Sequence, residues 1–267
     1  KNLLPNDPQF VEYLEINPPY VSTLSFRAEF IEDCSPYSKP IVSVQYPGDY
    51  FVTIKEGRVY THDTKNTAVI SGDNYLIDEV SFQWNGEREK MKDGNENAIF
   101  MLKGFTEPKK YPGKVFSLLA GGSPKFYYYH WLIESMPKLY LLKQSGQFDN
   151  VDYFLVPNYE YRYQSEYIDH FGITGDKIIN DELEYHIKAD ELMVCSYVRL
   201  EDHHPKWACD FLYNSFITPS PITKRDKLIY IGRGDSAVNR KVINEHELTD
   251  VLKSYGFEIH FLTGLSV

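Results

Sequence analysis

The sequence has few cysteines, no long apolar run and no basic block, and each absence excludes a class of protein. Its three cysteines, Cys34, Cys195 and Cys209, are odd in number and widely spaced among 267 residues, which suits neither a disulfide framework nor a Cys-x-x-Cys metal site. No apolar stretch approaches the ~20 residues that a membrane-spanning helix needs. The formal net charge is -10, so nucleic acid and anionic membrane surfaces are unfavourable partners.

Two further absences concern the compartment. The chain contains no Asn-x-Ser/Thr sequon, which fits a protein that never meets a secretory lumen. It begins at Lys1 without a Met and without the charged and apolar segments of a signal peptide. We therefore expect a cytoplasmic protein whose natural start lies upstream of Lys1.

What is present points to a globular α/β protein of two domains. Hydrophobic residues make up 42% of the chain, and aromatic residues make up 15%, with 22 Tyr and 16 Phe. Residues 1–40 are rich in Pro, Asn and Tyr and predict an extended arm. Over residues 41–104 short apolar runs alternate with turn signals such as Pro47-Gly48, Glu56-Gly57 and Asn85-Gly86, which predicts a β-meander.

From residue 115 to residue 217 the pattern changes to alternating strands and helices. The predicted strands are 115–120, 151–156 and 191–197, and the predicted helices are 123–145, 161–171 and 205–216. Such alternation is typical of βαβ units with a mostly parallel sheet. We assign residues 1–217 to one domain, composed of the meander and this α/β layer.

A second domain begins after the Pro-rich segment 218–221. Its predicted elements are a strand at 227–231, a helix at 245–255 and a strand at 258–262, so that 222–267 is one βαβ unit. An α/β domain needs more strands than these, and we therefore expect this domain to be incomplete, with the donor side of the protein cut short.

The first candidate site lies on the helix predicted from residue 123. His130 and Glu134 are four residues apart and share one helix face. A carboxylate one turn away can orient an imidazole and raise its basicity, as a general base near neutral pH requires. The spacing alone equally fits a surface His–Glu pair or a core histidine among aromatic residues.

The second candidate site is the loop after the strand 227–231. Arg233 and Arg240 leave the carboxyl end of a strand, where open α/β sheets bind ligands. Asn244 and Glu245 begin the next helix, whose amino terminus favours an anion, and Arg binds phosphate with two parallel hydrogen bonds. Solvated arginines and a plain Asn244 helix cap explain the same residues.

Other motifs are weaker. The run from Asp93 to Asn97 resembles a calcium loop, but Ala98 and Gly104 stand where such a loop needs Gly and Glu. His203 and His204 have no third ligand at a suitable spacing, so a loop entering a helix is the simpler interpretation. We therefore expect no metal site and no bound cofactor.

The two candidate segments together resemble glycosyltransferase family 61. The first segment is Tyr129–Leu142, with the sequence YHWLIESMPKLYLL, which resembles the hallmark helix of that family. The second comprises YIGR at 230–233, RKVINE at 240–245 and Gly256-Phe257. The resemblance covers roughly residues 115–267. The family includes bacterial capsular-polysaccharide enzymes, plant xylosyl- and arabinosyltransferases, and animal O-linked N-acetylglucosamine transferases.

The resemblance implies a fold of the GT-B type, with two Rossmann-type domains. Residues 1–217 would then bind the acceptor, and 222–267 would begin the nucleotide-sugar domain. It also implies inversion at the anomeric carbon without a catalytic metal, in keeping with the absence of any Asp-x-Asp tripeptide. His130 and Glu134 would be catalytic, whereas Arg233, Arg240, Asn244 and Glu245 would bind a UDP-sugar donor.

The expected partners are a nucleotide sugar and a glycan acceptor, and a homo-oligomer stays open. The alternative function is a non-catalytic carbohydrate-binding or assembly subunit of a polysaccharide-synthesis complex.

Overall fold

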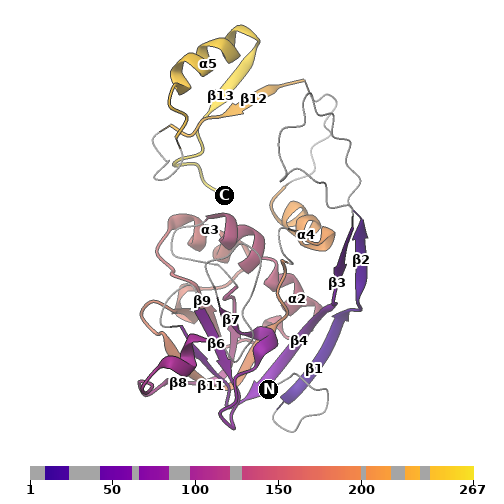
Figure 1. Ribbon diagram of the computed structural model, residues 1–267, viewed down its shortest axis with the longest axis vertical. Helices are drawn as coiled ribbons and strands as arrows, with labels where there is room; N and C mark the ends of the chain where they lie inside the picture. The colour runs from indigo at the N-terminus through magenta and orange to yellow at the C-terminus, as the bar shows by residue number, and fades with distance from the viewer. Residues whose placement is uncertain are drawn as a thin grey trace. The chain divides into compact units, whose positions relative to one another are not determined.

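A computed structural model describes residues 10–23, 43–61, 66–83, 97–120, 128–199, 203–217, 226–234 and 241–267 (Figure 1). The chain forms two compact units, Lys1–Ser215 and Phe216–Val267, and each is described by itself. The predicted linker at 218–221, the calcium-like run at 93–96 and Arg240 lie outside the described residues.

The strands of the first unit come from both halves of its sequence. They are β1 (Phe10–Asn17), β2 (Tyr20–Thr23), β3 (Ser43–Tyr46), β4 (Asp49–Lys55), β5 (Arg58–Tyr60), β6 (Asn66–Ile70), β7 (Phe82–Gln83), β8 (Lys109–Ser117), β9 (Tyr153–Val156), β10 (Ile178–Asn180) and β11 (His186–Cys195).

Its helices follow mainly from β8 onward. They are α1 (Tyr128–His130), the π-helical turn η4 (Trp131–Ser135), α2 (Lys138–Gln144), α3 (Arg162–His170) and α4 (Lys206–Phe216), with short 3₁₀ turns η1 (Asp78–Val80), η3 (Ala98–Met101), η5 (Phe148–Asn150) and η6 (Gly175–Lys177).

A nine-stranded mixed sheet organises this unit. Its order is β10-β9-β8-β11-β5-β6-β7, with β4 pairing to β11 and β1 pairing to β4. The segment β10-β9-β8-β11 is parallel throughout. The prediction of a parallel α/β layer after residue 115 is thus confirmed, although the strand β10 was missed and β8 begins earlier than expected.

The meander expected at 41–104 is present only in part, since consecutive pairing holds for β5-β6-β7 alone. Both β4 and β5 run antiparallel to β11 and lie end to end along it, with Lys55 opposite Glu191 and Arg58 opposite Lys188. The predicted Glu56-Gly57 turn is therefore a kink within one line of strand. A Cβ on Gly57 would lie 2.6 Å from Leu192 Cβ, so glycine is required there by close packing.

One hydrophobic core unites the two halves of this sheet. Its buried side chains come from the early strands as well as from the parallel strands, and include Val52, Ile54, Val115, Leu155 and Leu192. The arm expected at residues 1–40 also joins the sheet in part, because β1 pairs with β4. The N-terminal strands and the α/β layer therefore form one folded unit.

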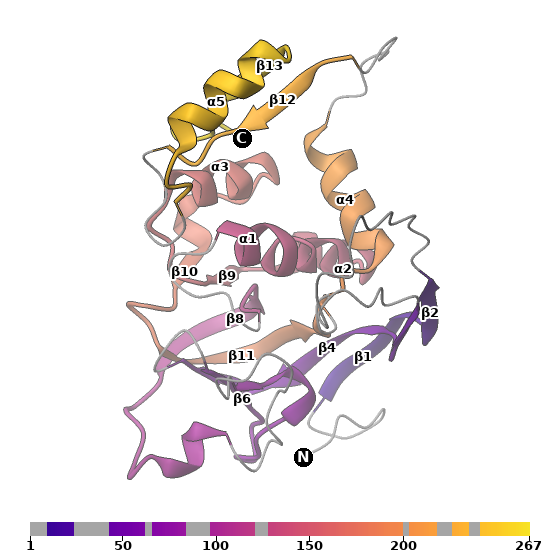
Figure 2. The same ribbon diagram turned by 45° about the horizontal axis from the view of Figure 1, so that its top comes forward.

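Helices α1 and α2 lie over one face of this sheet (Figure 2). Helix α4 is tied to the early strands through the buried carboxylate of Asp49, which accepts hydrogen bonds from Trp207 Nε1 at 3.0 Å and from Asn17 Nδ2 at 2.7 Å. Among the described residues, none of the helices combines the length and the apolar character that crossing a lipid bilayer requires.

The second unit is a single βαβ motif. Strands β12 (Leu228–Ile231) and β13 (Phe257–His260) are parallel neighbours, joined by α5 (Glu245–Ser254). This agrees with the elements predicted from the sequence. The chain is therefore an α/β protein with parallel strand–helix–strand units in both parts.

Candidate functional site

The principal cluster of polar side chains lies at the carboxyl ends of β8 and β11. These two parallel strands are neighbours in the sheet, although their last residues, Ser117 and Cys195, are 78 positions apart in the chain. The strand order β10-β9-β8-β11 reverses at this pair. In open α/β sheets, the carboxyl ends of the strands at such a reversal form the usual ligand site.

The helix that leads away from β8 is interrupted by a wider turn. Residues 131–135 form a π-helical turn, and the Met136 amide donates to the Trp131 carbonyl at 3.1 Å. Pro137 accounts for the interruption, because it has no N–H to donate and its ring crowds the preceding turn. The sequence predicted one continuous helix over 123–145, and the structure shows a π turn within that range, a feature often found at functional sites.

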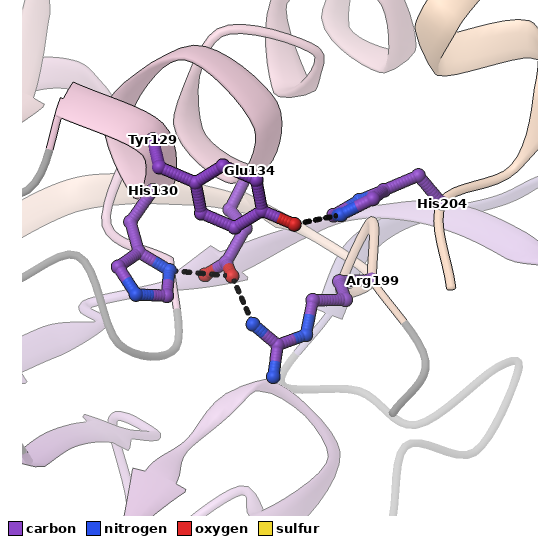
Figure 3. A network of polar contacts seen from close by, with 5 residues as sticks. All are labelled: Tyr129, His130, Glu134, Arg199 and His204. Atoms are coloured by element: carbon purple, nitrogen blue, oxygen red, sulfur yellow. Dashed lines mark hydrogen bonds and ion pairs between the residues drawn. The ribbon is translucent and has the colours of Figure 1, made fainter. Parts of the chain in front are cut away.

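His130 and Glu134 are joined by a hydrogen bond across this turn, as predicted from their spacing. His130 Nδ1 lies 2.7 Å from Glu134 Oε1. The Glu134 side chain is only 5% exposed, whereas that of His130 is 23% exposed. A third residue reaches the same oxygen, since Arg199 Nη1 donates to Glu134 Oε1 at 3.0 Å (Figure 3). A buried carboxylate is thus bonded to an imidazole and a guanidinium.

A second pair of side chains lies beside this group. Tyr129 Oη and His204 Nε2 are 2.6 Å apart, and the Tyr129 ring meets the His130 ring edge-on with centroids 5.4 Å apart (Figure 3). Burial lowers the pKa of His204, so this imidazole is neutral near pH 7. His204 therefore contributes a polar contact to the cluster without adding a positive charge.

Lys138 lies fully buried one turn beyond Glu134. Its Nζ donates a hydrogen bond to the Leu119 carbonyl, just after β8, and lies 5.7 Å from the centre of the Tyr197 ring. Burial lowers the pKa of the Lys138 ammonium. This lysine therefore links the helix that carries Glu134 to the end of β8.

In the second unit, the carboxylate of Glu245 holds the loop that follows β12. Its Oε1 accepts from the Arg233 amide at 2.7 Å and from Tyr230 Oη at 3.0 Å, and its Oε2 accepts from the Gly234 amide at 2.9 Å. The two backbone donors lower the pKa of Glu245. The backbone N–H groups of Arg233 and Gly234 are therefore bonded to a carboxylate of the chain itself.

The other residues of the predicted donor site have different positions. Asn244 stands at the helix start, but its side chain makes no capping hydrogen bond and its Nδ2 donates to Glu247 Oε2 at 3.3 Å. The prediction that its side chain caps the helix is therefore wrong, because its backbone (φ −114°, ψ 42°) lies outside the extended conformation that a capping residue adopts. The Arg233 side chain is exposed.

Sequence reasoning missed Arg199, His204, Tyr129 and Lys138 as members of the cluster. The available signal was the position of Arg199 just beyond a predicted strand, but nothing in the sequence indicated that this strand lies beside β8. Over the described ranges, no three His, Cys, Asp or Glu side chains lie close enough together to hold a metal ion.

Comparison with known families identifies the class of protein. Residues 128–267 match the family described as Glycosyltransferase 61, and the match contains the whole cluster from Tyr129 to His204 and the β12–α5 loop. The chain belongs to this family, whose members transfer sugars from a donor to an acceptor. No curated protein matches the chain.

Proposed function

We propose that this glycosyltransferase moves a sugar from a nucleotide donor, a UDP-sugar, to a glycan hydroxyl with inversion at the anomeric carbon. The observation that carries the proposal is the hydrogen bond from His130 to the buried Glu134 carboxylate at 2.7 Å, within the segment that matches the family. The contact occupies Nδ1, so the Nε2 atom is the one assigned to the acceptor.

In this mechanism His130 is the general base. As the acceptor oxygen attacks the anomeric carbon, its proton passes to His130 Nε2 and the bond from that carbon to the diphosphate breaks. The electron pair of that bond leaves with the nucleoside diphosphate. Glu134 holds the imidazole with Nδ1 protonated and stabilises the imidazolium that forms, as a carboxylate partner does in other base-assisted transfers.

The donor side of the proposal is the second unit, in a two-domain GT-B arrangement. Arg233 and Arg240 would neutralise the charge that develops on the departing diphosphate. Asn244 and Glu245 belong to the same site. There Glu245 fixes the conformation of the loop after β12, because its carboxylate accepts hydrogen bonds from two backbone amides. We propose that no metal ion takes part, because the resemblance implies none and no Asp-x-Asp tripeptide occurs.

The biological setting is proposed from the same reasoning. Polysaccharide synthesis, as of a bacterial capsule, suits a family whose members build glycans, and the lack of sequons and of a cysteine framework supports a cytoplasmic reaction.

The test is the His130→Ala variant in protein expressed from the complete gene. Release of UDP from a panel of UDP-sugars with glycan acceptors should fall by roughly 10²–10⁴-fold, the usual worth of general acid–base catalysis. Calorimetry should show unchanged affinity for UDP. His170→Ala, on an exposed position of α3, is the matched control and should keep full turnover.

Two outcomes would contradict the proposal. Full turnover per folded molecule in His130→Ala would make the histidine a structural residue. Wild-type protein that binds glycans without binding or cleaving any nucleotide sugar would instead be a non-catalytic carbohydrate-binding subunit.

A further inference from the structure

Arg199 and His130 contact the same carboxylate oxygen of Glu134. Arg199 Nη1 donates to Glu134 Oε1 at 3.0 Å, and His130 Nδ1 lies 2.7 Å from the same atom. Figure 3 shows the guanidinium and the imidazole reaching this oxygen from different directions. Arg199 and Glu134 are 65 positions apart in the chain, so their contact exists only because β11 lies beside β8.

The helix backbone alone does not fix this carboxylate. The turn between His130 and Glu134 is π-helical, and its backbone hydrogen bond runs from the Met136 amide to the Trp131 carbonyl. Such a turn spaces residues differently from an α-helix, in which residues four apart lie on one face. The last torsion of a glutamate side chain is also broad, without sharply defined staggered positions. Side-chain contacts therefore decide where Oε1 lies.

Burial leaves these contacts to the protein. The side chain of Glu134 is 5% exposed, whereas those of Arg199 and His130 are 25% and 23% exposed. Water therefore has little access to the carboxylate, and a buried carboxylate without donors is costly. A guanidinium suits this position, since its planar group donates hydrogen bonds in fixed directions. Arg199 thus restrains the oxygen that in turn contacts the imidazole.

We propose that Arg199 is a positioning residue for the sugar transfer. It fixes the Glu134 carboxylate, and the carboxylate fixes the orientation of the His130 ring. The role is geometric: with Oε1 held at Nδ1, the ring keeps Nε2 directed at the acceptor hydroxyl, as a group that must meet a reacting atom requires. The inference rests on the proposed function, because the orientation of this ring matters to turnover only where His130 meets the acceptor.

The experiment uses Arg199→Ala in protein expressed from the complete gene. Its kcat for UDP release from a UDP-sugar with a glycan acceptor should fall by roughly 10–100-fold, the usual cost of a small misplacement of a reacting group. The KM for the donor should be unchanged. Millimolar guanidinium ion, which fits the vacated space, should restore much of the lost kcat, whereas urea or NaCl at the same concentration should not.

Two further variants control for stability. Arg162→Ala is the matched control, because Arg162 pairs with Glu166 on α3 and its side chain is 72% exposed. It should keep full kcat with or without guanidinium. Should Arg199→Ala not fold, Arg199→Met fills the same space without the donor, and its kcat should fall by a similar factor. An unchanged kcat in either folded Arg199 variant would overturn the proposal, as would a loss in Arg199→Ala that guanidinium does not relieve.

A crystal structure of Arg199→Ala separates this inference from the proposed function. It should show Glu134 Oε1 beyond hydrogen-bond distance of His130 Nδ1, with the helix backbone unmoved. That result in a protein that transfers no sugar would refute the proposed function and leave Arg199 as the residue that fixes the carboxylate. A carboxylate that keeps its contact with Nδ1 would overturn the inference even where His130→Ala supports the proposed function.

Discussion

At the residue scale, the cluster depends on charged groups that are buried together. Isolated buried charges are costly, and they persist when paired or when their pKa moves to favour the neutral form. Glu134 follows the first course, since His130 and Arg199 both contact one of its oxygens. Lys138 follows the second, because burial lowers its pKa. Glu134 and Lys138 thus avoid an isolated buried charge in different ways, the first by pairing and the second by a lowered pKa.

Lys138 gives a prediction about stability and pH. Its folded pKa is lowered from 10.5, so between that lowered value and 10.5 the unfolded chain binds more protons than the folded one. Stability contributed by this group therefore rises with pH across that window. Relative to Lys138→Met, the wild type should gain up to about 1.4 kcal/mol per pH unit, as measured by urea unfolding at several pH values.

The control for this prediction is Lys143→Met, an exposed position on the same helix. Its free energy of unfolding relative to wild type should stay flat over the same range. An equally flat difference for Lys138→Met would mean that the buried amine keeps its charge in the folded state.

At the element scale, each candidate site depends on how a helix begins after a strand. After β8, the π turn before Pro137 places His130 and Glu134 against each other. After β12, the Glu245 carboxylate at the start of α5 accepts the amides of Arg233 and Gly234. A Cβ on Gly232 would lie 2.4 Å from Phe261 Cε1, so the loop also needs glycine where it packs against this ring. Loop and helix are thereby joined into one element.

Glu245→Gln tests that junction. The amide group offers one acceptor where the carboxylate offers two and removes the negative charge, so the backbone amides of Arg233 and Gly234 should exchange with solvent faster. Hydrogen exchange read by NMR is the measurement. Because the pKa of Glu245 is lowered from 4.5, wild-type protection should persist as pH falls below 4.5 and disappear only below the lowered pKa.

Glu247→Gln supplies the comparison, since Glu247 lies in the same first turn and contacts only the Asn244 side chain among the hydrogen bonds described there. The same two amides should keep their wild-type exchange rates in this variant. Equal acceleration in both variants would assign the effect to the helix as a whole.

At the scale of the first unit, β11 is the strand on which the fold depends. It pairs with β8 along one edge and with β4 and β5 along the other. The residues of the N-terminal strands and of the α/β layer consequently share one core, and the cluster at the end of β11 is supported by both. We expect this unit to unfold as a whole.

Leu192→Ala tests this cooperativity. Leu192 is fully buried in β11, and its truncation should cost about 2–5 kcal/mol of the free energy of unfolding. Unfolding followed by tryptophan fluorescence and by circular dichroism should give coincident transitions. Leu183→Ala, at a position 77% exposed, should change stability by less than about 0.5 kcal/mol. Two separated transitions would mean that the N-terminal strands fold apart from the parallel layer.

The sequence by itself determined most of the strands and helices after residue 115 and the contact between His130 and Glu134. Local patterns are enough for this, because the apolar periodicity of strands and helices and the four-residue spacing of a helix turn depend only on neighbouring residues. The predicted βαβ units after residue 115 and after residue 226 are confirmed for the same reason. Local signals were ambiguous at Glu56-Gly57. The sequence predicted a turn there, and the structure shows a kink between β4 and β5, which both pair with β11.

Only the tertiary structure decided which distant segments meet. The pairing of β11 with both β8 and β4 comes from long-range packing that no local pattern encodes, and it brings Arg199 to Glu134 and His204 to Tyr129. The sequence placed the arginine after a strand but could not show which strand lies beside it. Arg199 and Glu134 are far apart along the chain, and only the pairing of β11 with β8 brings their side chains into contact.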